Sequence, residues 1–178
     1  TKIMIHKFAL IDPSAEIDEG VSIGPYSVIG PEVQIGKNSK IHSHVLVDGP
    51  TKIGEDNEIF QFASVGGDPQ DKKYQKEKTF LEIGNQNVIR EGVTINRGTV
   101  QEKSLTKIGS NNLIMAYCHI AHDCEIHDEV VLVNNASLAG SVKIQTGAIL
   151  GGFTLVHQFC RVGQYSFSAM GSSIGKDI

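Results

Sequence analysis

Two histidines, one carboxylate and two thiols fall within seven residues of this chain, in the stretch Cys118-His119-Ile120-Ala121-His122-Asp123-Cys124. Side chains of these types can bind a transition metal, or a histidine can act as a general base whose ring a carboxylate holds in place. They can also be ordinary core and surface residues. The choice depends on where each side chain points, and that follows from the repeat around the stretch.

An aliphatic residue recurs at every sixth position over most of the chain, with a mostly small residue two positions before it. The period runs from Ile11 to Val65, and it runs unbroken again from Ile108 to Val162. A period of six matches neither the turn of an α-helix nor the alternation of one long strand. It indicates short strands separated by turns, and each strand buries the aliphatic and the small residue. Repeats of this length build parallel β-helices.

The pattern resembles that of left-handed parallel β-helices, in which three hexapeptides form each coil. The resemblance covers nearly the whole chain and implies an all-β fold, with residues 1–178 forming one domain. Two stretches depart from the period, at about 67–80 and 97–105, and we expect them to protrude as loops. Loops that leave a regular scaffold often carry function.

The repeat places Cys118, Cys124 and Cys160 at the small inward position, so we expect all three to be inert core residues. Cys124 and Cys160 lie two coils apart, which is too far for a disulfide. An odd number of cysteines without a disulfide framework favours a reducing, cytoplasmic environment.

Composition excludes several classes of protein. The net charge is -4 and there is no long basic run, so nucleic-acid binding has no electrostatic support. The sequence has neither an apolar stretch of about 18 residues nor an apolar segment near its N-terminus. We therefore expect no membrane span and no signal peptide.

His122 falls outside the inward positions, so we expect it on the surface of the β-helix. The column of residues stacked on it continues through Gly140 to Gln158, and His157 lies beside Gln158. Asp123 can fix the tautomer of His122 and support its protonated form. The bare backbone of Gly140 can present an N–H group to a developing oxyanion.

Five groups of residues, in this order along the repeat, resemble the UDP-N-acetylglucosamine acyltransferase family. They are Gln70-Asp71-Lys72-Lys73-Tyr74, Ile89-Arg90-Glu91 with Arg97-Gly98-Thr99, His119-Ile120-Ala121-His122-Asp123-Cys124, Leu138-Ala139-Gly140 and Val156-His157-Gln158-Phe159-Cys160. The family moves a 3-hydroxyacyl group from acyl carrier protein to the 3-hydroxyl of UDP-N-acetylglucosamine, at the start of lipid A synthesis. The resemblance thus implies an acyltransferase with no metal and no cofactor.

By this resemblance His122 is the general base, Asp123 orients it, and the Gly140 N–H binds the thioester oxygen. The residues implied in binding the sugar nucleotide and the acyl chain are Gln70, Asp71, Lys73, His119, His157 and Gln158. The family works as a homotrimer with each site between neighbouring subunits. It also carries a helical C-terminal domain, and the comparison implies that this sequence lacks it.

Met170 resembles the family position that sets the length of the acyl chain. At about 4.8 Å per coil, Met170 lies about 13 Å beyond His122 along the axis of the β-helix. That reach suits a ten-carbon chain, so the sequence predicts a preference for 3-hydroxydecanoyl over 3-hydroxymyristoyl donors. Ser141 and Asn96 stand where the family commonly has histidine, which bears on substrate contacts rather than on the base.

Three alternatives stay open at this stage. The sister N-acyltransferase of lipid A synthesis shares the fold and the base, although the Gln-Asp-x-Lys-Tyr motif favours the O-acyltransferase. A γ-type carbonic anhydrase needs three histidines for each zinc ion, and His122 with His127 supplies only a pair. A solenoid that only binds or scaffolds other proteins needs none of these groups.

Overall fold

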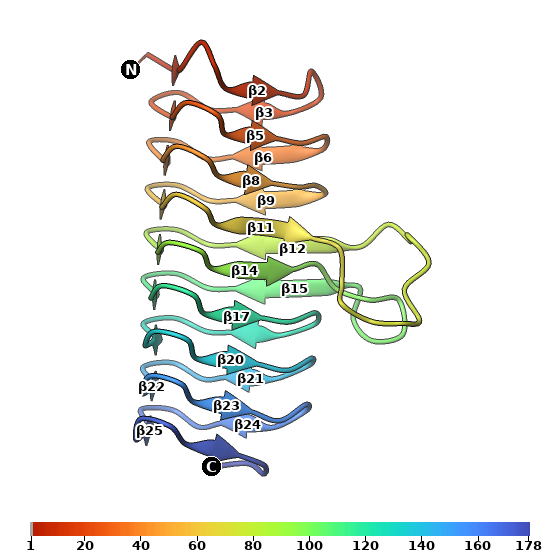
Figure 1. Cartoon of the computed structure of the whole chain (residues 1–178), viewed down its shortest axis with the longest axis vertical. Helices are drawn as coiled ribbons and strands as arrows, with labels where there is room; N and C mark the ends of the chain where they lie inside the picture. The colour runs from red at the N-terminus through yellow and green to blue at the C-terminus, as the bar shows by residue number, and fades with distance from the viewer. Residues whose placement is uncertain (1) are drawn as a thin grey trace.

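The computed structural model describes residues 2–178 as a left-handed parallel β-helix with three parallel sheets along its length (Figure 1). Every third strand along the sequence belongs to the same sheet, so each coil contributes one strand to each sheet. The predicted all-β fold with three repeats per coil is therefore confirmed. Residues 2–178 contain no helix that is long and apolar enough to cross a membrane.

Most strands are only two residues long, so each places one side chain inward and one outward. Sheet A contains β1 (Met4–Ile5), β4 (Ser22–Ile23), β7 (Lys40–Ile41), β10 (Glu58–Ile59), β13 (Val88–Ile89), β16 (Leu113–Ile114), β19 (Val131–Leu132), β22 (Ile149–Leu150) and β25 (Phe167–Ser168). Sheet B contains β2 (Leu10–Ile11), β5 (Val28–Ile29), β8 (Leu46–Val47), β11 (Ser64–Gly67), β14 (Thr94–Asn96), β17 (His119–Ile120), β20 (Ser137–Leu138), β23 (Leu155–Val156) and β26 (Ser173–Ile174). Sheet C contains β3 (Glu16–Ile17), β6 (Val33–Ile35), β9 (Thr51–Ile53), β12 (Phe80–Ile83), β15 (Leu105–Ile108), β18 (Glu125–Ile126), β21 (Lys143–Ile144) and β24 (Arg161–Val162).

Two loops interrupt the regular stacking of the coils. Neighbouring coils pair at an offset of 18 residues, as from Met4 to Ser22. The offset is 30 residues from Ser64 to Thr94 and 25 residues from Thr94 to His119. The extra residues form loop 68–79, between β11 and β12, and loop 97–104, between β14 and β15. Figure 1 shows both loops protruding on the same side of the β-helix.

The interior holds the aliphatic residue of each strand and the small residue two positions before it. Ile120 is fully buried, and so is its small partner Cys118. All three cysteines are buried and free. Burial raises the pKa of the Cys118 thiol to about 11 and that of the Cys124 thiol to about 12. Thiols of this kind are poor nucleophiles near neutral pH, so the prediction that these two cysteines are inert core residues is confirmed.

A ladder of buried asparagines runs through the middle coils. The Oδ1 atom of Asn57 accepts a hydrogen bond from the Asn87 backbone N–H at 2.9 Å, and the Oδ1 atom of Asn87 accepts one from the Asn112 N–H at 3.0 Å. Asn87 also donates from Nδ2 to the carbonyl of Gly109 at 2.9 Å. The ladder thus provides partners for buried and half-buried backbone groups at these turns.

Replacing Asn87 by alanine is expected to lower the free energy of unfolding by about 2–4 kcal/mol, because the Asn112 N–H and the Gly109 carbonyl lose their partners inside the protein. Urea unfolding followed by circular dichroism measures the loss. Asn134→Ala is the matched control, since Asn134 is exposed. Equal stabilities of the two variants would contradict the role of the ladder.

Candidate active site

The predicted catalytic residues lie at one corner of the β-helix. We call it the B–C corner, the turn that follows each strand of sheet B. Loop 68–79 and loop 97–104 leave the β-helix at this corner in two successive coils, and His122 and Asp123 form the corner in the next coil. Gly140 occupies the same corner one coil further on. The two loops, the histidine and the glycine are therefore neighbours, although they are spread over residues 68–140.

His122 and Asp123 form a hydrogen-bonded pair. The Nδ1 atom of His122 lies 2.9 Å from Oδ2 of Asp123. A carboxylate can only accept, so Nδ1 carries the proton and Nε2 keeps a free lone pair. His122 is only 8% exposed, whereas the sequence placed it on the open surface. This pair is the arrangement that general-base catalysis requires.

Asp123 is held by donors that sequence analysis did not find. It is fully buried and has a φ of 62°, in the left-handed region that aspartate tolerates better than most residues. Its carboxylate accepts hydrogen bonds from the Thr99 backbone N–H at 3.0 Å, from the Thr99 Oγ1 hydroxyl at 2.6 Å and from the Lys103 N–H at 3.1 Å. Together with His122 these donors fix the carboxylate and compensate its burial.

Gly140 lies directly against the imidazole of His122. A Cβ atom built on Gly140 would come within 2.5 Å of Cε1 and 2.7 Å of Nε2 of His122. No hydrogen bond from the Gly140 N–H to another group is found within residues 2–178. The basic nitrogen of His122 therefore sits beside an available backbone donor, which is the combination needed to activate a hydroxyl and stabilise an oxyanion.

His119 lies close to this pair and is partly buried. Its Nδ1 atom is 2.7 Å from the hydroxyl of Thr94. Burial, and then the neighbouring charge of His122, lower the pKa of His119 below its usual value. His119 is thus neutral near pH 7, so it can act as a hydrogen-bond partner and does not take up the proton that His122 would accept.

The coil that follows Gly140 contains an apolar groove. His157 and Gln158 are exposed at the B–C corner, and Gln158 is stacked beyond Gly140 as predicted. A hollow of about 560 Å³ beside them is lined by Ala139, Leu155, Val156, His157, Ser173, Ile174 and Gly175. A mostly aliphatic lining of this kind suits an alkyl chain.

The structure does not bring every predicted residue to His122. Gln70, Asp71 and Lys73 lie on loop 68–79, where the Asp71 carboxylate accepts the Lys73 backbone N–H at 2.9 Å. Met170 is 77% exposed and lies at a different corner, in the turn after β25 of sheet A. The distance along the axis therefore does not place Met170 in front of His122 of the same chain.

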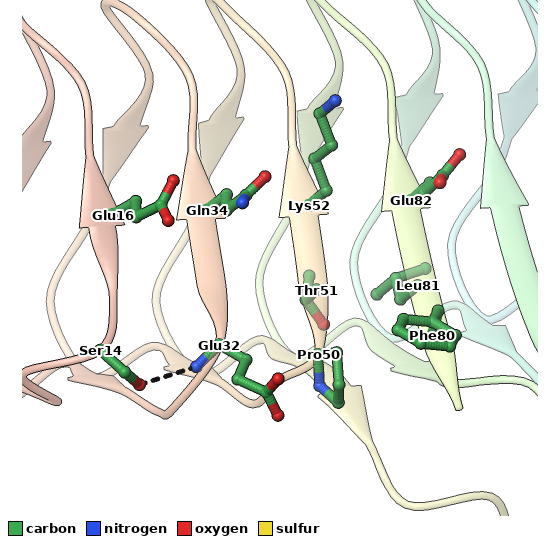
Figure 2. Close-up of a pocket in the computed structure, with 10 residues that line it drawn as sticks. All are labelled: Ser14, Glu16, Glu32, Gln34, Pro50, Thr51, Lys52, Phe80, Leu81 and Glu82. Atoms are coloured by element: carbon green, nitrogen blue, oxygen red, sulfur yellow. Dashed lines mark hydrogen bonds between the residues drawn. The ribbon is translucent and has the colours of Figure 1, made fainter. Parts of the chain in front are cut away.

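A separate hollow lies on sheet C, well before the coil that carries His122. Figure 2 shows its ten lining residues, with Glu16, Gln34, Lys52 and Glu82 in a row on successive strands. Its volume is about 350 Å³, and none of the predicted site residues lines it. Within residues 2–178, no group of three or more histidine, cysteine, aspartate or glutamate side chains is arranged to hold a metal ion.

The comparisons with known proteins agree with the fold. Residues 14–49 and 105–140 match the model of the family described as bacterial transferase hexapeptide (six repeats). The chain is 57% identical, over 98% of its length, to the acyl-[acyl-carrier-protein]–UDP-N-acetylglucosamine O-acyltransferase of Herminiimonas arsenicoxydans, of which it covers 67%. It is 65% identical, over 96% of its length, to the same-named protein of Alkalilimnicola ehrlichii, of which it covers 66%.

Solved structures give the same result. The LpxA of Acinetobacter baumannii is matched over 98% of this chain and 68% of its own, with a TM-score of 0.98 and 54% identity. The UDP-N-acetylglucosamine acyltransferase of Francisella novicida is matched over 98% of this chain and 63% of its own, with a TM-score of 0.97 and 47% identity. The chain spans about two thirds of the length of these relatives.

The left-handed β-helix and its hexapeptide repeats are those of the hexapeptide-repeat transferases. The relatives are O-acyltransferases by name, and they do not support the N-acyltransferase, the carbonic anhydrase or the scaffold. The chain belongs to the acyl-[acyl-carrier-protein]–UDP-N-acetylglucosamine O-acyltransferase family.

Proposed function

We propose that this chain carries the catalytic centre for transfer of a 3-hydroxyacyl group from acyl carrier protein to the 3-hydroxyl of UDP-N-acetylglucosamine. The names of the relatives supply the two substrates. The observation that carries the chemistry is the buried His122–Asp123 pair packed against Gly140. The same centre has no need of a cofactor, because acyl transfer from a thioester requires only a base and an oxyanion donor.

In this mechanism Nε2 of His122 takes the proton of the sugar hydroxyl while the oxygen attacks the thioester carbonyl. Asp123 stabilises the imidazolium that results. The Gly140 N–H holds the oxyanion of the tetrahedral intermediate. Collapse of the intermediate breaks the carbon–sulfur bond, and the imidazolium returns the proton to the departing thiolate. The ester product and the free thiol leave the enzyme, and His122 is regenerated.

The remaining predicted residues have separate tasks. His119, His157 and Gln158 surround the corner at which the sugar hydroxyl must lie, and they supply hydrogen bonds to the sugar and to the acyl 3-hydroxyl. The apolar groove beside His157 receives the alkyl chain. Gln70, Asp71 and Lys73, on loop 68–79, bind the polar nucleotide part of the acceptor.

The faces of the β-helix support a homotrimer. The outward residues of sheet C strands are charged or polar and alternate in sign over much of the sheet, as a face in water would be, and they are Glu16, Gln34, Lys52, Glu82, Lys107, Glu125, Lys143 and Arg161. Those of sheet B are apolar or small apart from His119, and they are Leu10, Val28, Leu46, Ser64, Thr94, His119, Ser137, Leu155 and Ser173. A cyclic trimer that buries sheet B places each B–C corner against a neighbour and completes each site between two subunits.

This arrangement gives Met170 its role. Met170 lies at the corner that begins sheet B, whereas His122 lies at the corner that ends it. In a cyclic trimer these two corners of neighbouring subunits meet. Met170 of one subunit then closes the groove that starts at His122 of the next, and limits the acyl chain to about ten carbons, given about 4.8 Å per coil.

Replacing Met170 by glycine is expected to open the groove and raise kcat/KM for a 3-hydroxymyristoyl donor by about tenfold or more, because each additional buried CH₂ contributes about 0.8 kcal/mol. Rates with 3-hydroxydecanoyl and 3-hydroxymyristoyl acyl carrier protein measure the change. Ala169→Gly is the control, since Ala169 is an exposed neighbour of Met170. An unaltered ratio of the two rates in Met170→Gly would contradict the role.

The proposed function is tested by acyl transfer from a panel of acyl carrier protein thioesters to UDP-N-acetylglucosamine, in the intact protein that carries this chain. Transfer to the sugar oxygen, shown by an ester product that mild base cleaves, is the expected result. An amide product on an amino sugar, or no transfer with any donor, would overturn it. We place the reaction in the cytoplasm, where buried free thiols stay reduced.

A further inference from the structure

Arg97, at the start of loop 97–104, holds loop 68–79. It is 6% exposed. Its guanidinium donates hydrogen bonds to the Gly66 carbonyl at 2.5 Å, to the Asp68 carboxylate at 2.5 Å and to the Tyr74 hydroxyl at 3.0 Å. Its backbone N–H donates to the Gly67 carbonyl at 3.0 Å. The buried side chain of Arg97 therefore holds both the start of loop 68–79 and its middle.

The contacts of Arg97 lie on both sides of the predicted substrate residues of the loop. The three predicted substrate residues of the loop, Gln70, Asp71 and Lys73, all lie between Asp68 and Tyr74. Arg97 thus clamps both ends of the short segment that carries them. The loop also has an ion pair from Lys78 to Glu32, but both of those side chains are mostly exposed, so water and salt screen the pair.

The segment 97–99, which contains Arg97, also holds the carboxylate of Asp123. Thr99, two residues after Arg97, gives both its backbone N–H and its hydroxyl to Asp123. Gly98 between them is packed closely against the end of loop 97–104, because a Cβ atom there would lie 2.1 Å from the backbone nitrogen of Leu105. The Gly98 N–H also donates to the Phe80 carbonyl at 3.1 Å, where loop 68–79 rejoins the β-helix.

We propose that Arg97-Gly98-Thr99 is a positioning segment that couples the substrate loop to the His122–Asp123 pair. Arg97 sets the loop through Asp68 and Tyr74, and Thr99 sets the tilt of the Asp123 carboxylate and, through it, the ring of His122. Neither residue touches the reacting atoms. Because only the closely packed Gly98 separates the two anchors, a change in the loop on binding the acceptor is passed to Asp123 and His122. This inference rests on the proposed function and deepens it.

Substitutions of Arg97 and of Thr99 are expected to have different kinetic effects. Arg97→Met releases the loop and raises KM for UDP-N-acetylglucosamine about tenfold or more, because charge-assisted hydrogen bonds that hold the binding residues are lost. Thr99→Val keeps the shape of the side chain but removes the hydroxyl from Asp123. It is expected to lower kcat about 10- to 100-fold at nearly unchanged KM, because a tilted imidazole no longer faces the sugar hydroxyl. Thr99→Ser restores the hydroxyl and recovers kcat.

Both variants are expected to fold. Asp68 is 61% exposed at its side chain and becomes hydrated when Arg97 is replaced. Asp123 keeps the two backbone N–H groups and His122 when the Thr99 hydroxyl is removed. Thermal unfolding of each variant confirms that kinetics are compared below its transition. The matched controls are Arg90→Met, which removes a surface pair with Glu91, and Thr154→Val, which removes a buried hydroxyl bound to Ser168.

A second measurement does not need activity. Trypsin cleaves after Lys72 and Lys73, so the rate of cleavage in loop 68–79 reports how firmly the loop is held. We expect cleavage to be at least about fivefold faster in Arg97→Met, and unchanged in Arg90→Met and Thr99→Val. Cleavage and KM of Arg97→Met equal to those of the unaltered protein would overturn the loop half of the proposal.

An unaltered kcat in Thr99→Val, or a kcat in Thr99→Ser as low as that in Thr99→Val, would overturn the proposal that Thr99 positions Asp123 and His122. Failure of the proposed function looks different. In that case the unaltered protein transfers no acyl group with any donor, while the proteolysis experiment still shows whether Arg97 holds the loop. An active protein whose Arg97 and Thr99 variants behave like the controls would reject the inference alone.

Discussion

The His122→Ala variant is expected to lose acyl transfer, with kcat lowered by about 10²- to 10⁴-fold, the contribution of a positioned general base. Nε2 of His122 lies beside Gly140, and no hydrogen-bond partner of this nitrogen is found within residues 2–178. KM for the sugar nucleotide should change little, because His122 acts mainly in the transition state. Steady-state rates with a matched acyl carrier protein thioester measure both constants.

His127→Ala is the matched control for this variant. His127 lies one turn further along the chain, and its ring pairs with Glu125 on the surface of sheet C, at 3.2 Å. Its replacement should leave kcat unchanged. If His122→Ala kept the full rate, the sugar hydroxyl would have to lose its proton to another group, and the proposed mechanism would fail.

The Gly140→Ala variant is expected to lower kcat about 100-fold, since even a small displacement of a catalytic group has an effect of this size. The added methyl group would overlap the ring of His122, at 2.5 Å from Cε1. The φ angle of Gly140 lies outside the left-handed region, so alanine fits the backbone, and the closest conflicts of its methyl group are with the imidazole. The variant should therefore lose activity and show a lower Tm.

A double variant provides the control for Gly140→Ala. In a His122→Ala background the methyl group enters the space that the imidazole leaves, so adding Gly140→Ala should not lower Tm further. Calorimetry of the single and double variants measures this coupling. Equal losses of Tm in both backgrounds would show that the methyl group strains something other than His122.

Much of the fold followed from a single periodicity. The six-residue spacing identified the inward residues, and it predicted that Cys118 and Cys124 are core residues, as the structure confirms. It also aligned His122 with Gly140, because uninterrupted coils of constant length stack equivalent positions. Where two residues lie in the unbroken block, spacing alone places one above the other.

Loop 97–104 breaks the period, so the repeat could not predict where its side chains and backbone N–H groups lie. Thr99 and Lys103 reach Asp123 from the previous coil, and their hydrogen bonds depend on the path of an irregular segment. The burial of His122 was missed for a similar reason, since the repeat assigns its position to the surface. For Met170 the spacing predicted the distance along the axis, but the incomplete coil between it and His122 turns it to another corner.

The sequence by itself determined the β-helix, its core and the stacking of His122 on Gly140, because these depend on local repeats that act coil by coil. Only the tertiary structure decided how the His122–Asp123 pair is held. Arg97 and Thr99 lie far from Asp123 in sequence, and their contacts arise where two irregular loops meet one corner of a regular scaffold. Periodicity specifies the scaffold, whereas the loops are specified by hydrogen bonds that exist only once the coils are stacked.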